Sequence, residues 1–314
     1  MNIHRKVPFT TIAVLMTSFN RRDQTLACLA ALSAQRDIEG ITVTVFLVDD
    51  NSTDSTTEAV RARFPEVNLL HGDGSLFWNG GMRLAFAMAM QRGFDAYFFL
   101  NDDTVLYEDA VRRLIDCAVS DKSLGNPPIV VGSTRSSITG KQSYGGFTMR
   151  GRGLKVHLRL VSPHPSHAIP CDTMNGNFAL IPAVIAEGIG NLEKRFRHQF
   201  GDIDYGFRAR LAGFDVDVAP GFVGECQENS ECGTWRDTSS TLAVRWKNLC
   251  SPKGVPPREW LLFVWRHFGW RFPLYAISPY VKTIASALLA RRPHREPVPG
   301  CISEAVIGGP CKRA

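Results

Sequence analysis

The stretch AYFFLNDD, residues 96–103, joins five apolar or aromatic residues to three polar ones. A short apolar run of this kind is typical of a buried strand, and the polar residues that follow it mark the strand's carboxyl end. Ligands of open α/β sheets bind at that edge. Asn and Asp also favour turns and helix caps, so the polar triplet in isolation is at least as typical of a turn. The surrounding sequence has to decide between these two interpretations.

Strand-like and helix-like segments alternate on the amino-terminal side of this stretch. The predicted segments are strands at 10–16, 41–48 and 67–70, a helix that ends at Ala34, and helices at 55–64 and 79–92. Together with the strand at 96–100, this alternation predicts a parallel sheet. The expected fold class is therefore α/β, with a Rossmann-like, mostly parallel sheet flanked by helices.

The second half of the chain is less regular. The predicted segments are a strand at 129–132, a turn at 144–146, a helix over 202–212 that ends at Gly213, and a short strand at 216–218. A basic stretch runs from Arg150 to Arg159. The sequence contains no internal repeat, and its 314 residues suffice for one α/β domain with appendages.

The composition is that of a folded globular protein. Apolar residues make up 44% of the chain and charged residues 21%, which argues against a disordered chain, a collagen or a coiled coil. The net charge of +6 is modest for this length, and we expect no nucleic-acid partner. The sequence lacks a nucleophile elbow, a Walker loop and a GxGxxG motif opening a first helix, which argues against hydrolases, kinases and dehydrogenases.

Several features predict a cytoplasmic protein that does not span a membrane. The first residues lead into a strand-like run and lack the apolar stretch and small-residue cleavage site of a signal peptide. No run approaches the about 18 consecutive apolar residues that a spanning helix needs. The eight cysteines form no CxxC pair and no zinc-ribbon spacing, which favours reduced thiols.

Polar residues follow three of the predicted strands. Residues 17–19 follow the first strand, residues 49–50 the second and residues 101–103 the fourth. Oxygen ligands at the fourth strand suit a hard divalent cation, which neutralises a diphosphate leaving group. A carboxylate at the second strand can accept a hydrogen bond from a base imide or a ribose hydroxyl, while the residues after it can cap the next helix. Together the three sets predict a nucleotide-sized pocket.

Four motifs follow one another in a specific order. They are MTSFNR (16–21), VDDNSTD (48–54), FLNDD (99–103) and GDIDYGFRARLAGF (201–214). In order and spacing they resemble the motifs of the inverting family-2 glycosyltransferases with a GT-A fold, over residues 10–225. The resemblance implies a GT-A type sheet and transfer of a sugar from a nucleotide-diphosphate donor in one inverting displacement.

The resemblance also implies which residues contact the donor. By resemblance, the positions that contact the nucleobase and ribose in the family are Thr17, Phe19 and Asp50 here. Asp50 would recognise the base. The glycine-rich loop from Gly72 to Met82 resembles that of a rhamnosyltransferase-like bacterial subgroup, although tight packing would explain its Gly pair equally well. The residues expected to contact the nucleotide sugar are Thr17, Phe19, Asp50, Gly80, Gly81 and Asp102.

The metal-binding motif of the family, DxD, stands here as Asn101-Asp102-Asp103. By resemblance, Asp103 is the principal ligand of a divalent metal, Mg²⁺ or Mn²⁺, and Asn101 replaces the first acid as a further ligand. One charge fewer is expected to weaken metal binding. Many relatives add a His after the catalytic helix, and only Cys226 or Glu228 could substitute for it here.

The helix predicted at 202–212 opens with Gly201-Asp202, where many relatives have a Glu-Asp pair. The resemblance makes Asp202 the general base, which accepts the proton of the acceptor hydroxyl as that oxygen attacks the anomeric carbon. Asp204 is the second candidate for this role. In the alternative interpretation, both acids complement the helix dipole and pair with Arg208 and Arg210 on the same helix.

Further residues are candidates for contact with the acceptor or the donor sugar. The segment 171–177 precedes an apolar strand, and in relatives this place lies under both sugars. An aromatic residue in the glycine-rich loop could stack on a sugar or fill the core. The candidates are Trp78, Asn175, Asn177 and Asp204.

The region from Lys247 to Arg292 mixes Trp and Phe with Arg and Lys. This mixture suits helices at a bilayer interface, and it equally suits helices that cover the edge of the sheet. The expected organisation is a GT-A domain over 8–245 (nucleotide-binding half 8–110, acceptor half 111–245), a helical, membrane-associating extension over 246–292 and a disordered tail over 293–314.

The sequence therefore predicts a glycosyltransferase of the hexosyltransferase type, acting in the cytoplasm at the inner face of the membrane. It would move a hexose or deoxyhexose, with rhamnose as a candidate, onto a glycan or lipid-linked sugar in cell-surface polysaccharide synthesis. A sugar-1-phosphate nucleotidyltransferase is one alternative, although residues 17–22 lack its glycine-rich signature. A catalytically silent glycan-binding protein of the same fold is another, because Asn101 and Gly201 depart from the family motifs. The sequence does not set an oligomeric state.

Overall fold

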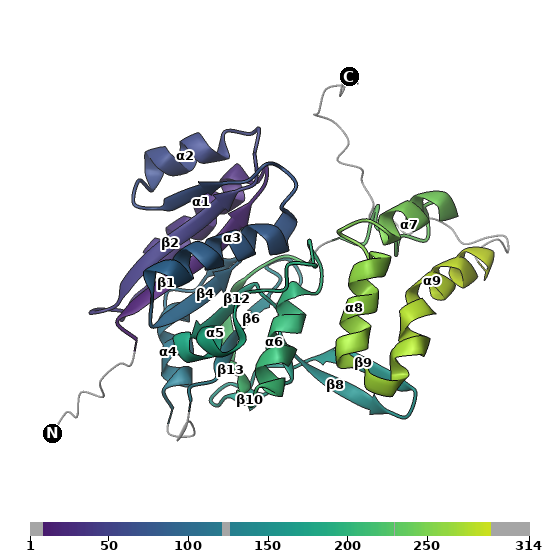
Figure 1. The fold of residues 1–314 in the computed structure, drawn as a ribbon. Coiled ribbons are helices and arrows are strands. Elements are labelled where there is room, and N and C mark those ends of the chain that lie inside the picture. The colour runs from purple at the N-terminus through teal and green to yellow at the C-terminus, as the bar shows by residue number, and fades with distance from the viewer. Residues whose placement is uncertain (1–8, 121–125, 229, 290–314) are drawn as a thin grey trace.

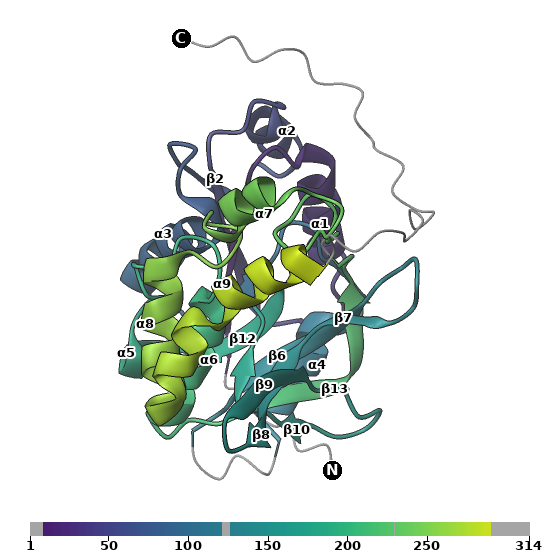
Figure 2. The ribbon, with the colours of Figure 1, turned by 90° about the vertical axis from the view of Figure 1, so that its right-hand side faces the viewer.

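The computed structural model describes residues 9–120, 126–228 and 230–289. Figure 1 shows a large sheet with helices on both faces, and a group of carboxyl-terminal helices beside it. In the view of Figure 2 these helices lie on the same side of the molecule as a small second sheet. The predicted α/β class with a helical carboxyl-terminal extension is confirmed.

Strands and helices alternate through the first part of the chain, and strands predominate in the middle. The helices are α1 (Arg22–Ser33), α2 (Thr56–Arg63), α3 (Phe77–Arg92), α4 (Ala110–Ala118), α5 (Ala183–Ile189), α6 (Gly201–Leu211), α7 (Leu242–Leu249), α8 (Pro257–His267), the 3-10 helix η1 (Gly269–Arg271) and α9 (Phe272–Leu289). The strands are β1 (Thr11–Ser18), β2 (Thr42–Asp49), β3 (Asn68–His71), β4 (Ala96–Leu100), β5 (Val105–Leu106), β6 (Ile129–Arg135), β7 (Gln142–Tyr144), β8 (Gly146–Arg152), β9 (Lys155–Leu160), β10 (Ile169–Pro170), β11 (Thr173–Met174), β12 (Phe178–Pro182) and β13 (Val216–Glu225).

The large sheet has the strand order β10-β13-β6-β12-β4-β1-β2-β3, with β5 paired to β13 and β7 to β6. The strands β4, β1, β2 and β3 are parallel, as predicted, and Ser18 of β1 pairs with Asp49 of β2. Their carboxyl ends therefore lie at one edge of the sheet. β12 runs antiparallel between β4 and β6, so the other half of the sheet is mixed.

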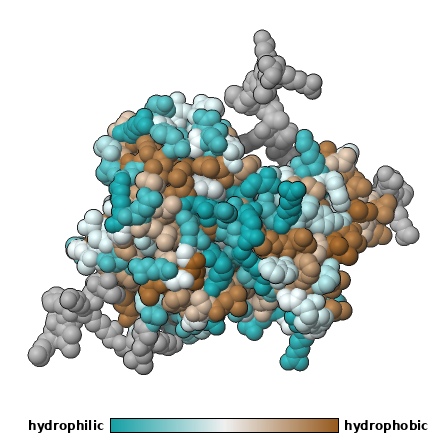
Figure 3. Space-filling model, in the orientation of Figure 1, coloured by the Kyte–Doolittle hydropathy of each residue, from teal (hydrophilic) through white to brown (hydrophobic). Residues whose placement is uncertain are grey.

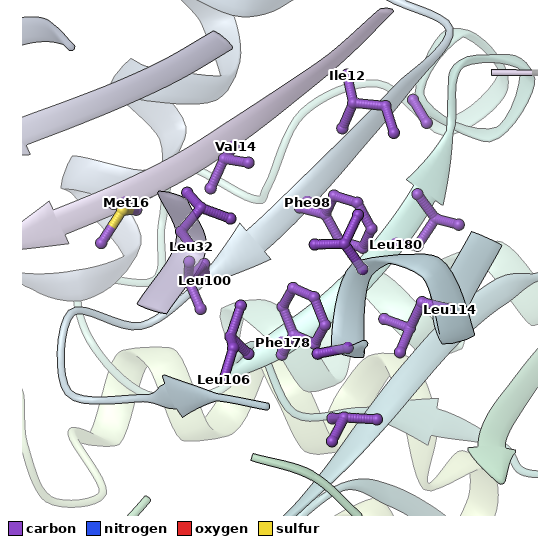
Figure 4. Close-up of a cluster of buried hydrophobic side chains, with 14 of the residues drawn as sticks. Ile12, Val14, Met16, Leu32, Phe98, Leu100, Leu106, Leu114, Phe178 and Leu180 are labelled. Atoms are coloured by element: carbon purple, nitrogen blue, oxygen red, sulfur yellow. The ribbon is translucent and has the colours of Figure 1, made fainter. Parts of the chain in front are cut away.

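Two apolar clusters cover the two faces of the sheet, because successive residues of a strand point to opposite sides. Ile12, Val14 and Met16 of β1 belong to the cluster that includes residues of α1 and α4, part of which is drawn in Figure 4. Ala13 and Leu15 belong to the opposite cluster, with residues of α3 and α6. β4 is buried along its whole length, since both of its faces are covered. This double burial explains the continuous apolar run that precedes the polar triplet.

β13 is longer than predicted and continues past Val218 to Glu225. Its pairing with β6 shifts register between Val218 and Phe222, and Gly221 has a φ of 64°. The Ala-Pro-Gly sequence at 219–221 interrupts the apolar pattern, which hid the second half of the strand. The basic stretch after Arg150 forms the hairpin β8–β9, which belongs to the separate sheet β11-β8-β9.

Aromatic side chains attach the carboxyl-terminal helices to the rest of the chain. Phe263 of α8 packs on Phe200 with ring centroids 5.0 Å apart and on Phe207 of α6 at 6.4 Å. The hydroxyl of Tyr275 in α9 donates to the carbonyl oxygen of Val156 in the hairpin at 2.6 Å. Within the described residues, no helix is long and apolar enough to cross a bilayer.

The structure also bears on the expected reduced thiols, the start of the extension and the expected tail. The cysteines that the structure describes as free thiols are Cys28, Cys117, Cys171, Cys226 and Cys250. Cys232 is disulfide-bonded, so the expectation of reduced thiols is wrong at this position. α7 begins at Leu242, ahead of the extension expected from residue 246, and the tail expected at 293–314 lies outside the described residues.

Candidate active site

The edge formed by the carboxyl ends of β1, β2 and β4 brings together most of the predicted site residues. Each of these strands ends within one of the predicted motifs. The glycine-rich loop reaches the same edge, because the indole of Trp78 bonds the side chain of Asn101. Segment 171–177 reaches it too, since the backbone of Asn101 donates to the carbonyl oxygen of Asn177 at 2.9 Å.

Asp102 and Asp103 share the guanidinium group of Arg21. Nη1 of Arg21 lies 3.1 Å from Oδ1 of Asp102 and 2.6 Å from Oδ2 of Asp103. Asp102 is 5% exposed, and its burial raises its pKa to about 6, against the lowering effect of Arg21. Arg21 was not among the predicted site residues, although it closes the MTSFNR motif three residues after the end of β1.

Trp78 occupies the space between Asn101 and the amino terminus of α6. Its Nε1 donates to Oδ1 of Asn101 at 2.7 Å, so the oxygen of that amide is oriented toward the indole. Its ring lies against Gly176, where a Cβ atom would come within 2.5 Å of the ring. The ring of Trp78 is therefore packed, as one of the two interpretations expects, and it forms a wall beside Asn101, while a stacking contact with a sugar stays a prediction.

Asp50 holds the glycine-rich loop in place. Its carboxylate accepts the backbone N–H groups of Gly74 at 2.9 Å and Phe77 at 3.1 Å. A carboxylate has about four lone-pair positions, so these bonds leave room for a contact with a nucleobase. Asp49 instead accepts the backbone N–H of Ser52 at 2.9 Å. Asp49 therefore stabilises the turn after β2, which is one of the two roles considered for these residues.

Thr17 packs closely against α3. A Cβ atom at Gly81 would lie 2.1 Å from Oγ1 of Thr17, so close helix–strand packing accounts for glycine at this position. Gly80 is less confined, since its nearest neighbour, Leu76, would lie 3.2 Å from a Cβ atom. Phe19 is 50% exposed just after β1, which leaves its ring free to contact a ligand.

Asn177 and Cys226 connect segment 171–177 to the strand-end acids. Nδ2 of Asn177 donates to Sγ of Cys226 at 3.2 Å, and Sγ lies 3.4 Å from Oδ1 of Asp103. Asn175 accepts the backbone N–H of Asn177 at 3.1 Å. Burial raises the pKa of Cys226 to about 12, so its thiol stays neutral near pH 7 and acts as a donor, not as a thiolate ligand. Glu228, the other substitute considered for the family histidine, is exposed.

Asp202 lies in the first turn of α6, beside the wall formed by Trp78. Its Oδ2 accepts the backbone N–H of Gly176 at 2.8 Å, and its Oδ1 accepts that of Ile203 at 2.8 Å. Burial raises the pKa of Asp202, and the two N–H donors partly offset this rise. A fixed carboxylate with a raised pKa has the chemistry that a general base requires.

Residues 13–168 match the family described as Glycosyl transferase family 2. This match covers slightly less than half of the chain, and over these residues the chain resembles a family-2 glycosyltransferase domain. It includes the first three of the four motifs and both strand-end acids. A search of curated proteins finds no match to the chain.

Solved structures resemble the chain at low identity. S. aureus TarS matches with a TM-score of 0.51 and 13% identity, over 83% of this chain and 44% of that one. The mannosyltransferase PcManGT from Pyrobaculum calidifontis, in complex with GDP-Man and Mn²⁺, matches with a TM-score of 0.49 and 16% identity, over 89% of this chain and 75% of that one. The likeness to TarS concerns the fold alone, and this chain spans less than half of TarS.

Gly201 stands where the resemblance implies a Glu, and Asn79 of α3 gives a physical reason for the glycine. A Cβ atom at Gly201 would lie 1.9 Å from Oδ1 of Asn79. Asn79 is fully buried, and its Nδ2 donates to the carbonyl oxygens of Glu193 at 3.0 Å and Phe196 at 2.6 Å. The sequence did not single out Asn79, because nothing in a local pattern shows that it meets a glycine more than a hundred residues away.

This contact predicts a coupling between the two positions. We expect Gly201→Ala to lower the free energy of unfolding by about 1–3 kcal/mol, since the new methyl group must displace the Asn79 side chain. Asn79→Ala loses hydrogen bonds, but it also removes the atoms that obstruct residue 201. The double variant should therefore be more stable than the sum of the single losses predicts, by about 1 kcal/mol. Urea unfolding of the four proteins measures this coupling, and additive losses would contradict it.

Asp204 is fully buried and is surrounded by basic side chains. Its carboxylate lies 2.9 Å from Nε of Arg208, 3.0 Å from Nη1 of Arg266 and 2.9 Å from Nε2 of His267. Burial alone would raise its pKa, but these three partners together lower it. We propose that Asp204 joins α6 to α8. This placement favours the structural interpretation over the sugar contact or second base expected from the sequence.

The strand-end acids fit a divalent cation with few protein ligands. Oδ2 of Asp102 is buried without a hydrogen-bond partner, and Asp103 adds a second carboxylate. The oxygen of Asn101 is already bonded to Trp78. Among the described residues, no group of three or more His, Cys, Asp or Glu side chains could hold a metal ion. Two carboxylates are nevertheless enough for a cation such as Mg²⁺, whose remaining ligands are water and substrate phosphate oxygens.

Proposed function

We propose that this chain transfers a sugar from a nucleotide-diphosphate donor to a glycan or lipid-linked acceptor, with inversion at the anomeric carbon. The observation that carries the proposal is the chain of contacts from Asp103 through Cys226 and Asn177 to the segment that holds Asp202. It links the acids that suit a diphosphate with a carboxylate that suits an acceptor hydroxyl. The family-2 match over residues 13–168 supports the donor half of this site.

In the proposed reaction Asp202 accepts a hydrogen bond from the acceptor hydroxyl. As the hydroxyl oxygen forms its bond to the anomeric carbon, the proton passes to the carboxylate of Asp202. The bond from that carbon to the diphosphate oxygen breaks on the opposite face, and its electron pair stays with the diphosphate. The backbone N–H groups of Gly176 and Ile203 keep Asp202 in place throughout.

The leaving diphosphate gains negative charge, and two sets of side chains would help to neutralise that charge. Asp102 and Asp103 would hold a divalent cation, Mg²⁺ or Mn²⁺, which supplies charge neutralisation to the diphosphate. Arg21 shares these carboxylates in the structure. We propose that its guanidinium turns toward the diphosphate once the carboxylates serve the cation, because Arg binds phosphate groups through several N–H donors.

The finer parts of the proposal rest on the sequence. We propose a hexose or deoxyhexose as the sugar, with rhamnose as a candidate, on the resemblance of the glycine-rich loop. Thr17, Phe19 and Asp50 would contact the nucleobase and ribose, and Gly80 and Gly81 would border the sugar nucleotide. We place the reaction in the cytoplasm, at the inner face of the membrane, in cell-surface polysaccharide synthesis.

A panel of nucleotide sugars tests the proposal by thermal unfolding. UDP-glucose, GDP-mannose and dTDP-rhamnose are each added with Mg²⁺, with Mn²⁺ or with a chelator. A donor at 100 times its Kd should stabilise the fold by about 2.7 kcal/mol, because it binds only the native state. We expect one donor to do so in the presence of metal.

The alternatives give other outcomes in the same experiment. A sugar-1-phosphate nucleotidyltransferase would respond to a sugar 1-phosphate with a nucleoside triphosphate and would form a nucleotide sugar from them. A silent glycan-binding protein would be stabilised by glycans but would release no nucleoside diphosphate from any donor. Stabilisation by none of the donors would contradict the proposed function.

A further inference from the structure

α9 exposes an apolar stripe along one side. Leu274, Ile277, Val281, Ile284 and Leu288 follow one another at intervals of three and four residues and are between 40% and 59% exposed. This spacing places them on one face of the helix. Figure 3 shows apolar surface over the carboxyl-terminal helices. A contiguous exposed apolar patch of this kind marks an interaction surface.

The other side of α9 belongs to the fold. Thr283 is buried, and Ser286 accepts a hydrogen bond from Nη2 of Arg245 in α7 at 2.9 Å. Tyr280 donates to the carbonyl oxygen of Val255 at 2.8 Å. These contacts fix the rotation of α9, so its apolar stripe faces outward.

The β8–β9 hairpin continues this surface. Nε of Arg271 in η1 donates to the carbonyl oxygen of Gly153 at 2.6 Å, which holds the tip of the hairpin beside the start of α9. Leu154 at the tip is 55% exposed, and Trp270 is 66% exposed. In Figure 2, α9 and the hairpin lie on the same side of the molecule. We call the α9 stripe, Trp270 and residues 150–159 the carboxyl-terminal face.

The charge of these segments selects the partner. Residues 242–289 contain seven Lys and Arg residues and one acid, Glu259, which is buried and paired with Arg197. Among the seven, Arg245 is buried and Arg266 is paired with Glu193 and Asp204, which leaves five cations for the surface. Residues 146–160 contain four Lys and Arg residues and no acid. Two copies of this face would bring cations together without acids to pair with them. A surface of anionic lipids would attract the same cations.

We propose that the carboxyl-terminal face docks on a bilayer that contains anionic lipids. The α9 stripe and Trp270 enter the headgroup region, where an amphipathic helix and a Trp ring are both favourable. The cations of the hairpin lie over the lipid phosphates. This proposal does not rest on the transferase reaction. With a lipid-linked acceptor, it would keep α6 near the membrane, because Phe207 of α6 packs on Phe263 of α8.

Vesicle flotation tests the docking. The full chain is mixed with vesicles of phosphatidylcholine alone or with about 30% phosphatidylglycerol. We expect flotation with the anionic vesicles, and we expect it to decrease with salt. The charge variant Arg152→Glu with Lys155→Glu should bind at least about 30-fold more weakly, as two lost contacts of about 1 kcal/mol each imply. The stripe variant Ile277→Gln with Val281→Gln should bind more weakly at every salt concentration.

Two control variants show whether a loss of binding is specific to the carboxyl-terminal face or follows from any change of charge or of exposed apolar surface. Arg61→Glu with Arg63→Glu changes the same charge on α2, and Leu211→Gln removes an exposed apolar side chain on α6. Both should float like the unmodified chain. The thermal unfolding midpoint of every variant checks its folding without any ligand. The shift of that midpoint with a nucleotide sugar checks the donor site separately, so failure to float leaves the transferase proposal untouched. If the stripe variant or the charge variant floated as well as the unmodified chain, the docking proposal would be overturned. Another outcome would also overturn it: the unmodified chain does not float, light scattering shows that it is a dimer, and the stripe variant is a monomer. The carboxyl-terminal face would then bind a second copy of the chain.

Discussion

Asp202→Asn should reduce sugar transfer by about 10²–10⁴-fold, which is the range for loss of a general base. The amide is nearly the same size, so the fold and the donor pocket should persist, but it cannot take up the proton of the acceptor hydroxyl. One of its two terminal atoms becomes an NH₂ group that faces the N–H of Gly176 or Ile203, so some loss of stability is also expected. Release of nucleoside diphosphate in the presence of acceptor measures the rate, and thermal stabilisation by the donor measures binding.

Asp204→Asn is the matched comparison, because it changes the other first-turn acid of α6. Its carboxylate pairs with Arg208, Arg266 and His267, so this variant should lose stability through an unbalanced buried charge. Below its unfolding temperature, its rate per folded molecule should stay close to that of the unmodified chain. If Asp204→Asn instead lost transfer activity per folded molecule while Asp202→Asn kept it, Asp204 would be the general base.

The pH dependence of transfer gives an independent check on the same residue. A general base acts in its deprotonated form, so kcat/KM should rise with pH through the pKa of Asp202. Burial raises this pKa, which places the rise at a higher pH than for an ordinary carboxyl group. The residual activity of Asp202→Asn should lack this rise.

The sequence predicted the parallel part of the sheet because local patterns determine it. Each of the strands β1, β2 and β4 is an apolar run that ends in polar residues, and parallel pairing carries those ends to one edge. The parallel pairing and the strand-end positions of Asp50 and Asp102 therefore followed from alternation and spacing, whereas their contacts with a donor come from the family resemblance and stay a prediction.

The remaining features depend on contacts between distant segments, which a local pattern does not contain. Arg21 meets Asp102 across 81 positions. The obstruction of Gly201 by Asn79 requires α3 and α6 to pack against each other. The second half of β13 follows a Pro-Gly pair that normally ends a strand, and only the structure shows that it carries Cys226 to Asp103. These are the positions at which the chain departs from the family motifs or adds to them.

Asp103→Ala should remove the metal-dependent part of nucleotide binding. Asp102 is buried and shares Arg21, so the loss of Asp103 leaves one carboxylate and one guanidinium that neutralise each other. With Mg²⁺ or Mn²⁺ present, we expect nucleoside diphosphate binding to weaken by about 100-fold, or ~2.7 kcal/mol. Isothermal titration with metal and with a chelator measures this, and the variant should give the same affinity in both.

Two further variants fix the interpretation of that result. Asp23→Ala removes an exposed carboxylate of α1 outside the site and should bind as the unmodified chain does. Asn101→Asp restores the acid of the family motif, and because an Asp oxygen can still accept from Nε1 of Trp78, it should tighten metal-dependent binding. Undiminished metal-dependent binding by Asp103→Ala would show that the cation does not use the strand-end acids. Arg21 would then be the principal positive charge at the diphosphate, since it already lies between the two carboxylates.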